Sequence, residues 1–386
     1  MKINLDLKAD TDPMKPDGSN YDFSELAELI KMNSNTHNKK GVDLLGKRYQ
    51  SLFEILGYHT KRYPRKDIGD HLLFSSQTKS GNKLLLLGHL DTVLPPEVPN
   101  LFSEDKDWIY GQGVCDMKGG IHVAICALRE VAKRYGSIAD IDVLLVSDEE
   151  TGSDDSRQIT AVLAKSYQAC LVFEAAGKNG EVVVGRKGVG TFAIDLSGKA
   201  AHAGNNYLQG ADANLAAAEM LIKLNQLTNL AQGTTVNVGK ISGGIGANTI
   251  SPNAHLLLEI RYSKHNERDR LLTAINRIVA TEQVKGVTAK LSGGIQRDVM
   301  QANDKQAQFL AKLESILGEK LPTETRGGVS DANIVSAAGV VTLDGFGPFG
   351  EHDHTKEERA CKKSFVRRVQ QVSLILLEYN GVKTNI

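Results

Sequence analysis

The chain has 386 residues, and its 46 lysines and arginines balance 46 aspartates and glutamates. This length favours two domains over one, and a formal net charge of zero argues against nucleic acid as a partner. The first ten residues lack the apolar core of a signal peptide, and no apolar run approaches the length of a membrane span. We therefore expect a cytoplasmic protein without membrane attachment.

Four cysteines lie far apart, in or near segments with a buried pattern, and none forms a CxxC pair. This distribution favours free thiols in a reducing compartment over a disulfide framework. Cys115 adjoins an aspartate of interest, but we interpret it as a small buried residue and not as a metal ligand.

The first half of the chain alternates helical and strand patterns. Apolar residues recur at helical spacing over residues 42–56 and again after Asp116. Short apolar runs bounded by turn residues predict buried strands. These runs span residues 71–75, 83–87, 141–146 and 170–173. The alternation predicts an α/β fold with a mixed, mostly parallel sheet sandwiched by helices.

The pattern changes after Gly185, where amphipathic strands and two helices follow in the order β-α-β-β-α-β. This order predicts a small four-stranded α+β sheet with two helices on one face. The strand patterns span residues 189–196, 234–241, 255–260 and 287–291, and the helix patterns span residues 215–222 and 271–278. The final segment returns to strand and helix. We therefore predict one discontinuous domain, residues 1–185 and 295–386, interrupted by an inserted domain, residues 186–294, with glycines at both junctions.

Acidic residues and histidines stand where several predicted strands end. They are His89, Asp91, Asp148, Glu149, Glu150 and Glu174, with Asp116 ahead of a helical pattern and residues 351–354 much later. Ligands bind open α/β sheets at the carboxyl ends of the strands, so these side chains can converge. Two histidines with several carboxylates predict a metal site, most simply for zinc.

Six stretches resemble, in family order, the zinc hydrolase family that includes glutamate carboxypeptidase, acetylornithine deacetylase and succinyl-diaminopimelate desuccinylase. They are residues 88–93, 111–120, 148–153, 197–204, 327–332 and 347–350. The matches cover nearly the whole chain, and the inserted block looks most like the glutamate carboxypeptidase branch. The resemblance implies a fold of the co-catalytic zinc exopeptidase type, with the inserted domain serving as a lid and a dimerisation domain.

The resemblance also implies a pair of zinc ions, for which Co²⁺ or Mn²⁺ are alternatives. His89 and Glu174 would bind one ion, Glu150 and His354 would bind the other, and Asp116 would bridge them. Such ions lie about 3.5–4 Å apart, so an anionic bridge screens their repulsion.

His352 is the alternative to His354 as the last ligand, because two residues so spaced point the same way in an extended segment. The family ligand is followed by a small residue and then by an acidic one. Thr355 and Glu357 match that pattern, so we prefer His354.

Two residues beside the ligands receive roles from the resemblance. Glu149 would act as the general base on the attacking water and then pass the proton to the leaving nitrogen. Asp91 would orient His89 through the other ring nitrogen.

The inserted block would supply contacts with the substrate. The resemblance implies that His202 stabilises the oxyanion from across a dimer interface and that Asn248 contacts the substrate. Arg261 would clamp the substrate carboxylate, because a planar guanidinium can bind both of its oxygens. Gly328 would let the backbone approach the substrate. The expected partners are a small peptide or N-acyl amino acid and a second copy of the chain.

Three functions compete. A carboxypeptidase, for example one that releases glutamate, or an N-acyl-amino-acid deacylase of the acetylornithine deacetylase or desuccinylase type would cut an amide whose amine side carries a free α-carboxylate. An aminopeptidase or dipeptidase needs a free amine, and Glu174 disfavours it because those branches usually carry aspartate there. A non-catalytic binding relative would have lost a ligand or Glu149, and none is lost. Variable loops read the acyl group, so its identity is not predicted.

Overall fold

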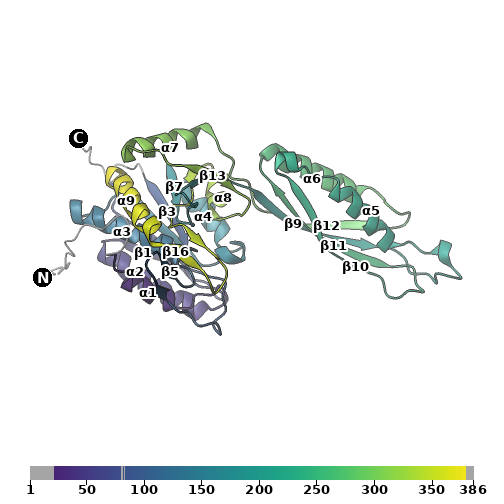
Figure 1. The fold of residues 1–386 in the computed structure, drawn as a ribbon. Coiled ribbons are helices and arrows are strands. Elements are labelled where there is room, and N and C mark those ends of the chain that lie inside the picture. The colour runs from purple at the N-terminus through teal and green to yellow at the C-terminus, as the bar shows by residue number, and fades with distance from the viewer. Residues whose placement is uncertain (1–20, 80, 82, 380–386) are drawn as a thin grey trace.

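The structure of the chain is a computed structural model that describes residues 21–79, 81 and 83–379. The described residues form two bodies joined by two connecting segments, and the first and last described elements, α1 (Ser24–Lys31) and α9 (Lys362–Tyr379), both lie in the larger body (Figure 1). Across the described part of the chain, no helix is both long enough and apolar enough to cross a membrane.

The larger body is built around a six-stranded sheet with the order β1-β2-β6-β3-β7-β14. Its strands are β1 (His59–Tyr63), β2 (His71–Ser75), β3 (Leu84–His89), β6 (Ile141–Val146), β7 (Ala169–Val172) and β14 (Val341–Leu343). From β6 through β3 and β7 to β14 the neighbours are parallel, whereas β1 and β2 add antiparallel pairs at one edge. The predicted mixed, mostly parallel sheet is confirmed.

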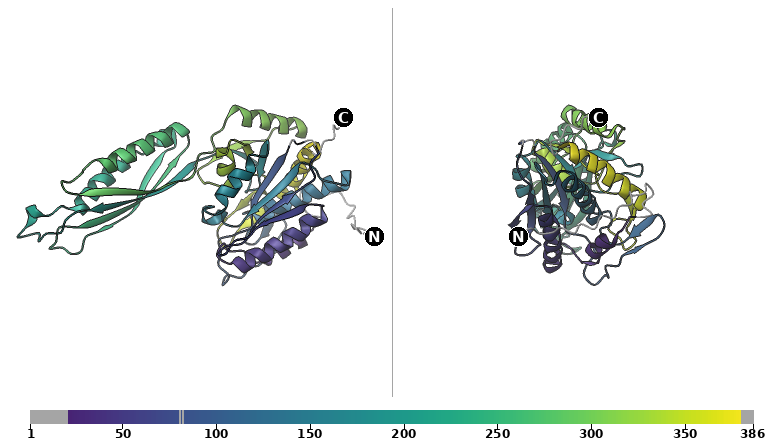
Figure 2. Two further views of the ribbon diagram at one scale, coloured as in Figure 1. Left: turned by 180° about the vertical axis from the view of Figure 1, so that it is seen from behind. Right: turned by 90° about the vertical axis from the view of Figure 1, so that its left-hand side faces the viewer.

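Helices cover both faces of this sheet (Figure 2). They are α1 (Ser24–Lys31), α2 (Lys39–Ile55), α3 (Lys118–Tyr135), α4 (Ser156–Ala164), α7 (Asp304–Leu317), α8 (Asp331–Ala337) and α9 (Lys362–Tyr379). Successive strand residues point to opposite faces. Leu84 and Leu86 therefore pack in one cluster with α2, α3 and α9, while Leu85 and Leu87 pack in another with α4 and α8. Burial on both faces explains why this strand is a continuous apolar run.

Two smaller sheets flank the site described below. One joins β8 (Val182–Arg186) to β13 (Thr323–Arg326) in parallel. The other has the order β15-β16-β5-β4, with β15 (Gly350–Glu351), β16 (Arg359–Cys361), β5 (Trp108–Tyr110) and β4 (Ser103–Glu104). Because β16 pairs with β5, two segments about 250 residues apart in sequence lie side by side, as the element bounds show.

The smaller body is a four-stranded antiparallel sheet with the order β10-β11-β9-β12, on which two helices pack. Its elements are β9 (Gly188–Ser197), α5 (Ala213–Asn225), β10 (Thr235–Gly243), β11 (Asn253–Tyr262), α6 (His265–Ala280) and β12 (Thr288–Arg297). We call residues 188–297 the inserted body. It projects away from the larger body (Figure 2). Its sheet begins and ends within a few residues of the predicted domain boundaries, which stay a prediction.

The predicted helix at residues 215–222 exists as α5, but the apolar residues that mark it face solvent. Leu215 and Ile222 are 48% and 58% exposed, and Ala218 between them is exposed as well. The side that packs on the sheet consists mainly of small residues, which are Ala213, Ala216, Ala217, Met220 and Leu224. α5 therefore carries a second apolar stripe on its outer side.

Candidate metal centre and active site

The predicted ligands come together because β6, β3 and β7 are adjacent and parallel. β3 ends at His89, β6 leads into the 3-10 turn η1 (Glu149–Thr151), and Glu174 lies just beyond β7. The loop after β5 brings Asp116 to the same edge, and the turn between β15 and β16 brings His354 beside it.

Asp116 lies between two histidines. Its Oδ1 is 3.0 Å from His89 Nε2, and its Oδ2 is 3.2 Å from His354 Nε2. Glu150 Oε2 lies 3.1 Å from His354 Nε2, and Glu174 Oε1 lies 3.7 Å from His89 Nε2. Donor atoms held tetrahedrally at about 2.0 Å from one ion are about 3.3 Å apart. The spacings therefore suit two adjacent ion sites that share Asp116.

Of the two candidate histidines, it is His354 that contacts Asp116 and Glu150. His352 is exposed, and its backbone carbonyl accepts hydrogen bonds from Thr355, which close the turn. The neighbouring carboxylate of Asp353 also has an oxygen within 4.8 Å of ligand atoms of Asp116 and His354. Sequence reasoning included Asp353 in the acidic segment 351–354 but did not name it as a ligand.

Three carboxylates are buried close together in this cluster. Burial raises the pKa of Glu174 well above its usual value, and the charge of Asp116 adds to the rise. The same two causes raise the pKa of Glu150. Burial would raise the pKa of Asp116 too, but hydrogen bonds from His354 and His89 hold it below its usual range. Cations stabilise such a cluster, and its imidazole and carboxylate donors are those that zinc accepts. The residues present therefore fit a pair of divalent metal ions.

Asp91 is fully buried and holds the turn that carries Glu149 and Glu150. Its carboxylate accepts hydrogen bonds from the backbone N–H groups of Glu149 and Glu150, at 3.2 and 3.1 Å, and from the hydroxyl of Thr36. His89 Nδ1 donates to the backbone carbonyl of Asp91 at 3.0 Å and lies 3.5 Å from its carboxylate. A carbonyl only accepts hydrogen bonds, so Nδ1 carries a proton, and Nε2, which faces Asp116, is the nitrogen that would bind a metal.

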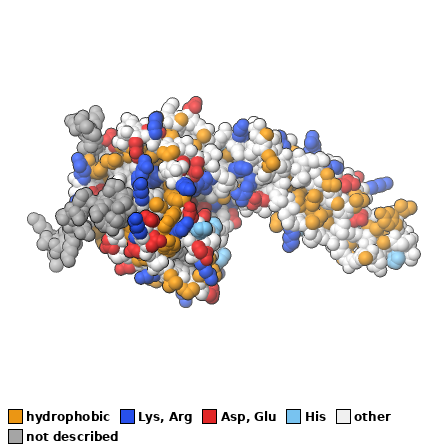
Figure 3. Space-filling view, in the orientation of Figure 1, with side chains coloured by type: hydrophobic (Ala, Val, Ile, Leu, Met, Phe, Trp, Pro, Cys, Tyr) orange, Lys and Arg blue, Asp and Glu red, His pale blue; other side chains and the backbone are white. Residues whose placement is uncertain are grey.

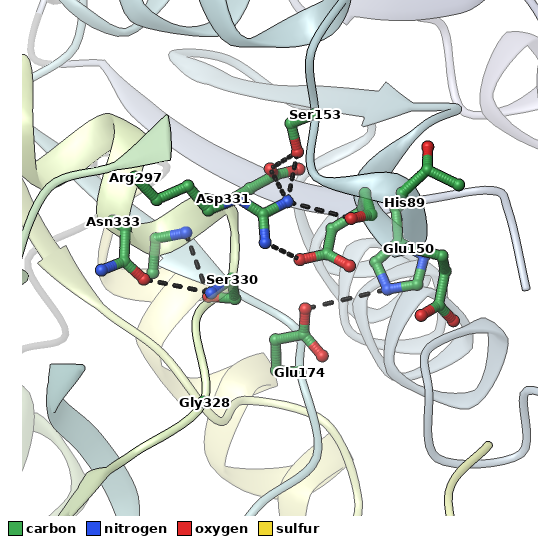
Figure 4. Close-up of polar contacts among 12 residues, drawn as sticks. His89, Glu150, Ser153, Glu174, Arg297, Gly328, Ser330, Asp331 and Asn333 are labelled. Carbon is green, nitrogen blue, oxygen red and sulfur yellow. Dashed lines mark hydrogen bonds and ion pairs between the residues drawn. The ribbon is translucent and has the colours of Figure 1, made fainter. Parts of the chain in front are cut away.

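Glu149, the predicted base, lies between the metal centre and a buried arginine. One of its oxygens is within 4.8 Å of ligand atoms of His89 and Glu174. Its Oε1 accepts a hydrogen bond from Arg297 at 2.8 Å, and Figure 4 shows this arginine pointing toward the acidic cluster. Burial raises the pKa of Glu149, and the charge of Arg297 opposes the rise.

The pattern of Peptidase family M20/M25/M40 matches residues 85–378, a span that contains the whole cluster. The chain belongs to this family. It is therefore a metal-dependent hydrolase, and the expected resemblance is confirmed at the level of the family.

Several known proteins are similar to this chain along most of their length. Carboxypeptidase G2 of Pseudomonas sp. (strain RS-16) is 24% identical over 376 residues, which cover 93% of this chain and 89% of the relative. Succinyl-diaminopimelate desuccinylase of Xylella fastidiosa is 26% identical over 310 residues, covering 75% and 81%. Among solved structures, aminopeptidase PepT from Bacillus cereus has a TM-score of 0.76 at 21% identity, covering 92% of this chain and 96% of that one.

A buried carboxylate that sequence reasoning missed supports Asp116, the predicted bridging residue. Glu358 accepts hydrogen bonds from the backbone N–H groups of Gly113, Cys115 and Asp116, at 2.7, 3.0 and 3.1 Å. It thereby fixes the loop that presents Asp116 to both histidines. The only signal in the sequence was the acidic residue expected after the last ligand. Its match, Glu357, is exposed, whereas its neighbour Glu358 is buried.

Arg261 and Gly328 lie near the junction of the two bodies. Arg261 donates to the backbone carbonyl of Gly327 at 2.9 Å and to Glu259 at 2.7 Å. Gly328 is exposed, and a Cβ built on it would meet open space. The packing of the protein therefore does not require glycine at this position, and the role of Gly328 in substrate binding stays a prediction.

His202 and Asn248 lie far from the metal centre of their own chain. The segment of His202 pairs with that of Thr249, and the backbone carbonyl of Asn248 accepts a hydrogen bond from Ala203. Both residues follow the end of the sheet opposite the junction, where Ser197 pairs with Asn253. β9 alone has ten residues, so this end is about 33 Å from the junction at 3.3 Å per residue.

Proposed function

We propose that this M20 peptidase is a di-zinc amidohydrolase that cleaves the amide of a peptide or N-acyl amino acid with a free α-carboxylate. The observation that carries the proposal is the position of Asp116 between His89 and His354, with Glu149 beside them. The similarity to a carboxypeptidase and a desuccinylase supports it.

The residues around Asp116 divide the chemistry between them. Two zinc ions, when bound by the five ligands, supply Lewis-acid polarisation of the substrate carbonyl and a lowered pKa for the attacking water. Glu149 takes the proton of that water and delivers it to the leaving nitrogen. Arg297 holds one oxygen of Glu149, and Asp91 holds its backbone N–H, so the base is kept in place.

Arg261 is the residue that we assign to the substrate carboxylate. It lies at the junction, its side chain is 34% exposed, and it pairs with Glu259. A substrate carboxylate would compete with Glu259 for the planar guanidinium, which binds two oxygens at once. An N-acyl-amino-acid deacylase makes the same demand on Arg261, whereas an aminopeptidase does not.

Hydrolysis should depend on metal and on the substrate carboxylate. A chelator should abolish activity, and Zn²⁺, Co²⁺ or Mn²⁺ should restore it, because water becomes a usable nucleophile at neutral pH only when a metal lowers its pKa. The measurement is amide hydrolysis over N-acyl glutamate, aspartate, ornithine and dipeptides, each also tested with the carboxylate amidated.

Full activity in metal-stripped protein would contradict the di-zinc proposal. Substrates that tolerate amidation of the carboxylate but not acetylation of the amine would instead identify an aminopeptidase. Such a preference for a free amine would leave the di-zinc proposal standing and would change only the proposed class of substrate.

We also propose a homodimer that forms through the inserted body. The outer stripe of α5, Leu215, Ala218 and Ile222, is exposed, and Figure 3 shows hydrophobic side chains at the surface of this body. α5 contacts β10, which pairs with a strand on one side only. A two-fold axis beside β10 would bring two stripes and two free strand edges together.

The variant Ile222→Asp should shift the protein from dimer to monomer, because it places a charge in the centre of the apolar stripe. Analytical ultracentrifugation measures the change. Val162→Asp is the matched control, because Val162 is a 62% exposed apolar residue on a helix of the larger body. A monomeric wild-type protein, or an Ile222→Asp variant that stays dimeric, would contradict the proposed interface.

We assign the enzyme to the cytoplasm. All four cysteines are free thiols. Burial raises the pKa of the Cys115 and Cys170 thiols, which lowers their reactivity. Unpaired thiols of this kind are typical of a reducing compartment.

A further inference from the structure

The backbone of Arg297 is part of the inserted body, whereas its side chain packs inside the larger body. It is the last residue of β12 and pairs with Val189 of β9, so its backbone is part of the inserted sheet. Its side chain is only 4% exposed and reaches into the acidic cluster of the larger body. It therefore connects the inserted sheet directly with the metal centre.

The guanidinium of Arg297 holds Glu149 at two points. NH1 donates to Glu149 Oε1 at 2.8 Å, and NH2 donates to the backbone carbonyl of Glu149 at 3.0 Å. NH2 also donates to Ser153 Oγ and lies 3.4 Å from Asp331 Oδ1, while Ser153 donates to Asp331 at 2.5 Å. Figure 4 shows Ser153 and Asp331 next to the guanidinium of Arg297. A planar guanidinium that is hydrogen-bonded at several points fixes the orientation of Glu149 and also places a positive charge beside it.

The connecting segments are pinned to the larger body just beyond Arg297. The side-chain amide of Asn333, on α8, donates to the backbone carbonyls of Lys187 and Asp298, at 3.0 and 2.7 Å. The two segments also bond to each other between Arg186 and Met300. Arg297 lies on the inserted-body side of these hydrogen bonds. A rotation of the inserted body about the bonded segments therefore moves Arg297 relative to Glu149.

We propose that Arg297 is a positioning residue that couples the orientation of the inserted body to the placement of Glu149. The inference rests on the proposed function, because it takes Glu149 as the base. Arg297 holds Oε1 and the backbone of Glu149, so the orientation of the carboxylate follows the orientation of β12. A substrate that draws in the inserted body through Arg261 thereby sets the base at the same time.

The test compares Arg297→Met and Arg297→Lys in the metal-loaded enzyme. Arg297→Met should lower kcat about 10- to 100-fold, because a displacement of about 1 Å of a reacting group has costs of this size. KM should change less than about threefold and the metal content should not change, because the side chain of Arg297 bonds to Glu149, Ser153 and Asp331 and to none of the proposed metal ligands. Arg297→Lys keeps the charge but has a single nitrogen to offer, so its kcat should be intermediate.

Two controls separate this coupling from a purely structural ion pair. Combined with Glu149→Gln, Arg297→Met should cause no further loss of kcat, since both changes act through one group. Arg157→Met should leave kcat within about twofold, because Arg157 bonds to the backbone carbonyl of Gln296, the neighbour of Arg297 in β12, and to Asp154, but not to Glu149.

A wild-type kcat in Arg297→Met, with Glu149→Gln inactive, would overturn the coupling and leave the proposed function standing. Loss of metal in Arg297→Met, or the same loss of kcat in the Glu149→Gln background, would also overturn it, since either marks a structural role. An active Glu149→Gln enzyme would overturn the base assignment itself. Should Arg297→Met fail to fold, Arg297→Lys decides: a lowered kcat with unchanged KM supports the coupling, and a wild-type kcat overturns it.

Discussion

Replacement of Glu149 by glutamine should lower kcat about 10²–10⁴-fold, the usual cost of losing a general base, while the bound metal stays at its wild-type level. The amide has nearly the same shape as the carboxylate, but it cannot accept the proton of the attacking water. The backbone contacts of Glu149 with Asp91 and Arg297 do not involve the side chain and are kept. The measurements are kcat and metal content per subunit.

The metal content is the deciding quantity, because the geometry gives Glu149 two possible roles. An oxygen of Glu149 lies within 4.8 Å of ligand atoms of His89 and Glu174, so these three residues also form a group of potential metal ligands. Glu150→Gln is the matched control: its oxygen contacts His354 Nε2 at 3.1 Å, so this variant should lose metal. If Glu149→Gln loses metal and Glu150→Gln does not, the two glutamates have exchanged roles.

The sequence predicts the ligand cluster because its members follow a local rule. His89 is the last residue of one buried strand, Glu174 stands just beyond a second, and Glu150 stands in the turn after a third. The carboxyl ends of adjacent parallel strands must meet at one edge. Knowledge of the strands therefore places the ligands near one another without knowledge of the remaining fold.

The residues that hold the cluster could not be predicted in this way. Arg297, Asn333 and Glu358 act on groups 148, 146 and 242 positions away in the chain. No short motif surrounds these residues. From the sequence alone, Arg297 is an ordinary residue at the end of a strand, Asn333 an ordinary helix residue and Glu358 an ordinary surface acid. Their importance follows from burial and from partners that only the tertiary structure brings near.

The outer stripe of α5 illustrates a different limit. Leu215, Ala218 and Ile222 have the spacing of a helix face that packs on a core, and the helix is present. The same spacing is expected of a face that packs on another subunit. Periodicity alone therefore predicts the helix but not the partner of its apolar side, which is exposed in the single chain.

The distance between His202 and the metal centre leads to the second large prediction. A donor that stabilises the oxyanion must lie roughly 2.7–3.1 Å from that oxygen. His202 lies beyond the far end of a ten-residue strand that starts at the junction, so we expect it to act in the site of a partner subunit. His202→Ala should lower kcat about 10²–10³-fold, the usual cost of one oxyanion donor, and should leave metal content unchanged.

Mixing the His202→Ala and Glu149→Gln proteins should recover activity that neither shows alone. In a mixed dimer, the site of the His202→Ala subunit keeps its own Glu149 and receives the intact His202 of the other subunit. With random exchange, half of the dimers are mixed and each has one complete site, so about one quarter of wild-type activity should return. Exchange is verified by mass spectrometry of differently tagged subunits. Mixed dimers that stay inactive would show that His202 does not serve the partner's site. A His202→Ala protein with wild-type kcat would show that the histidine takes no part in turnover.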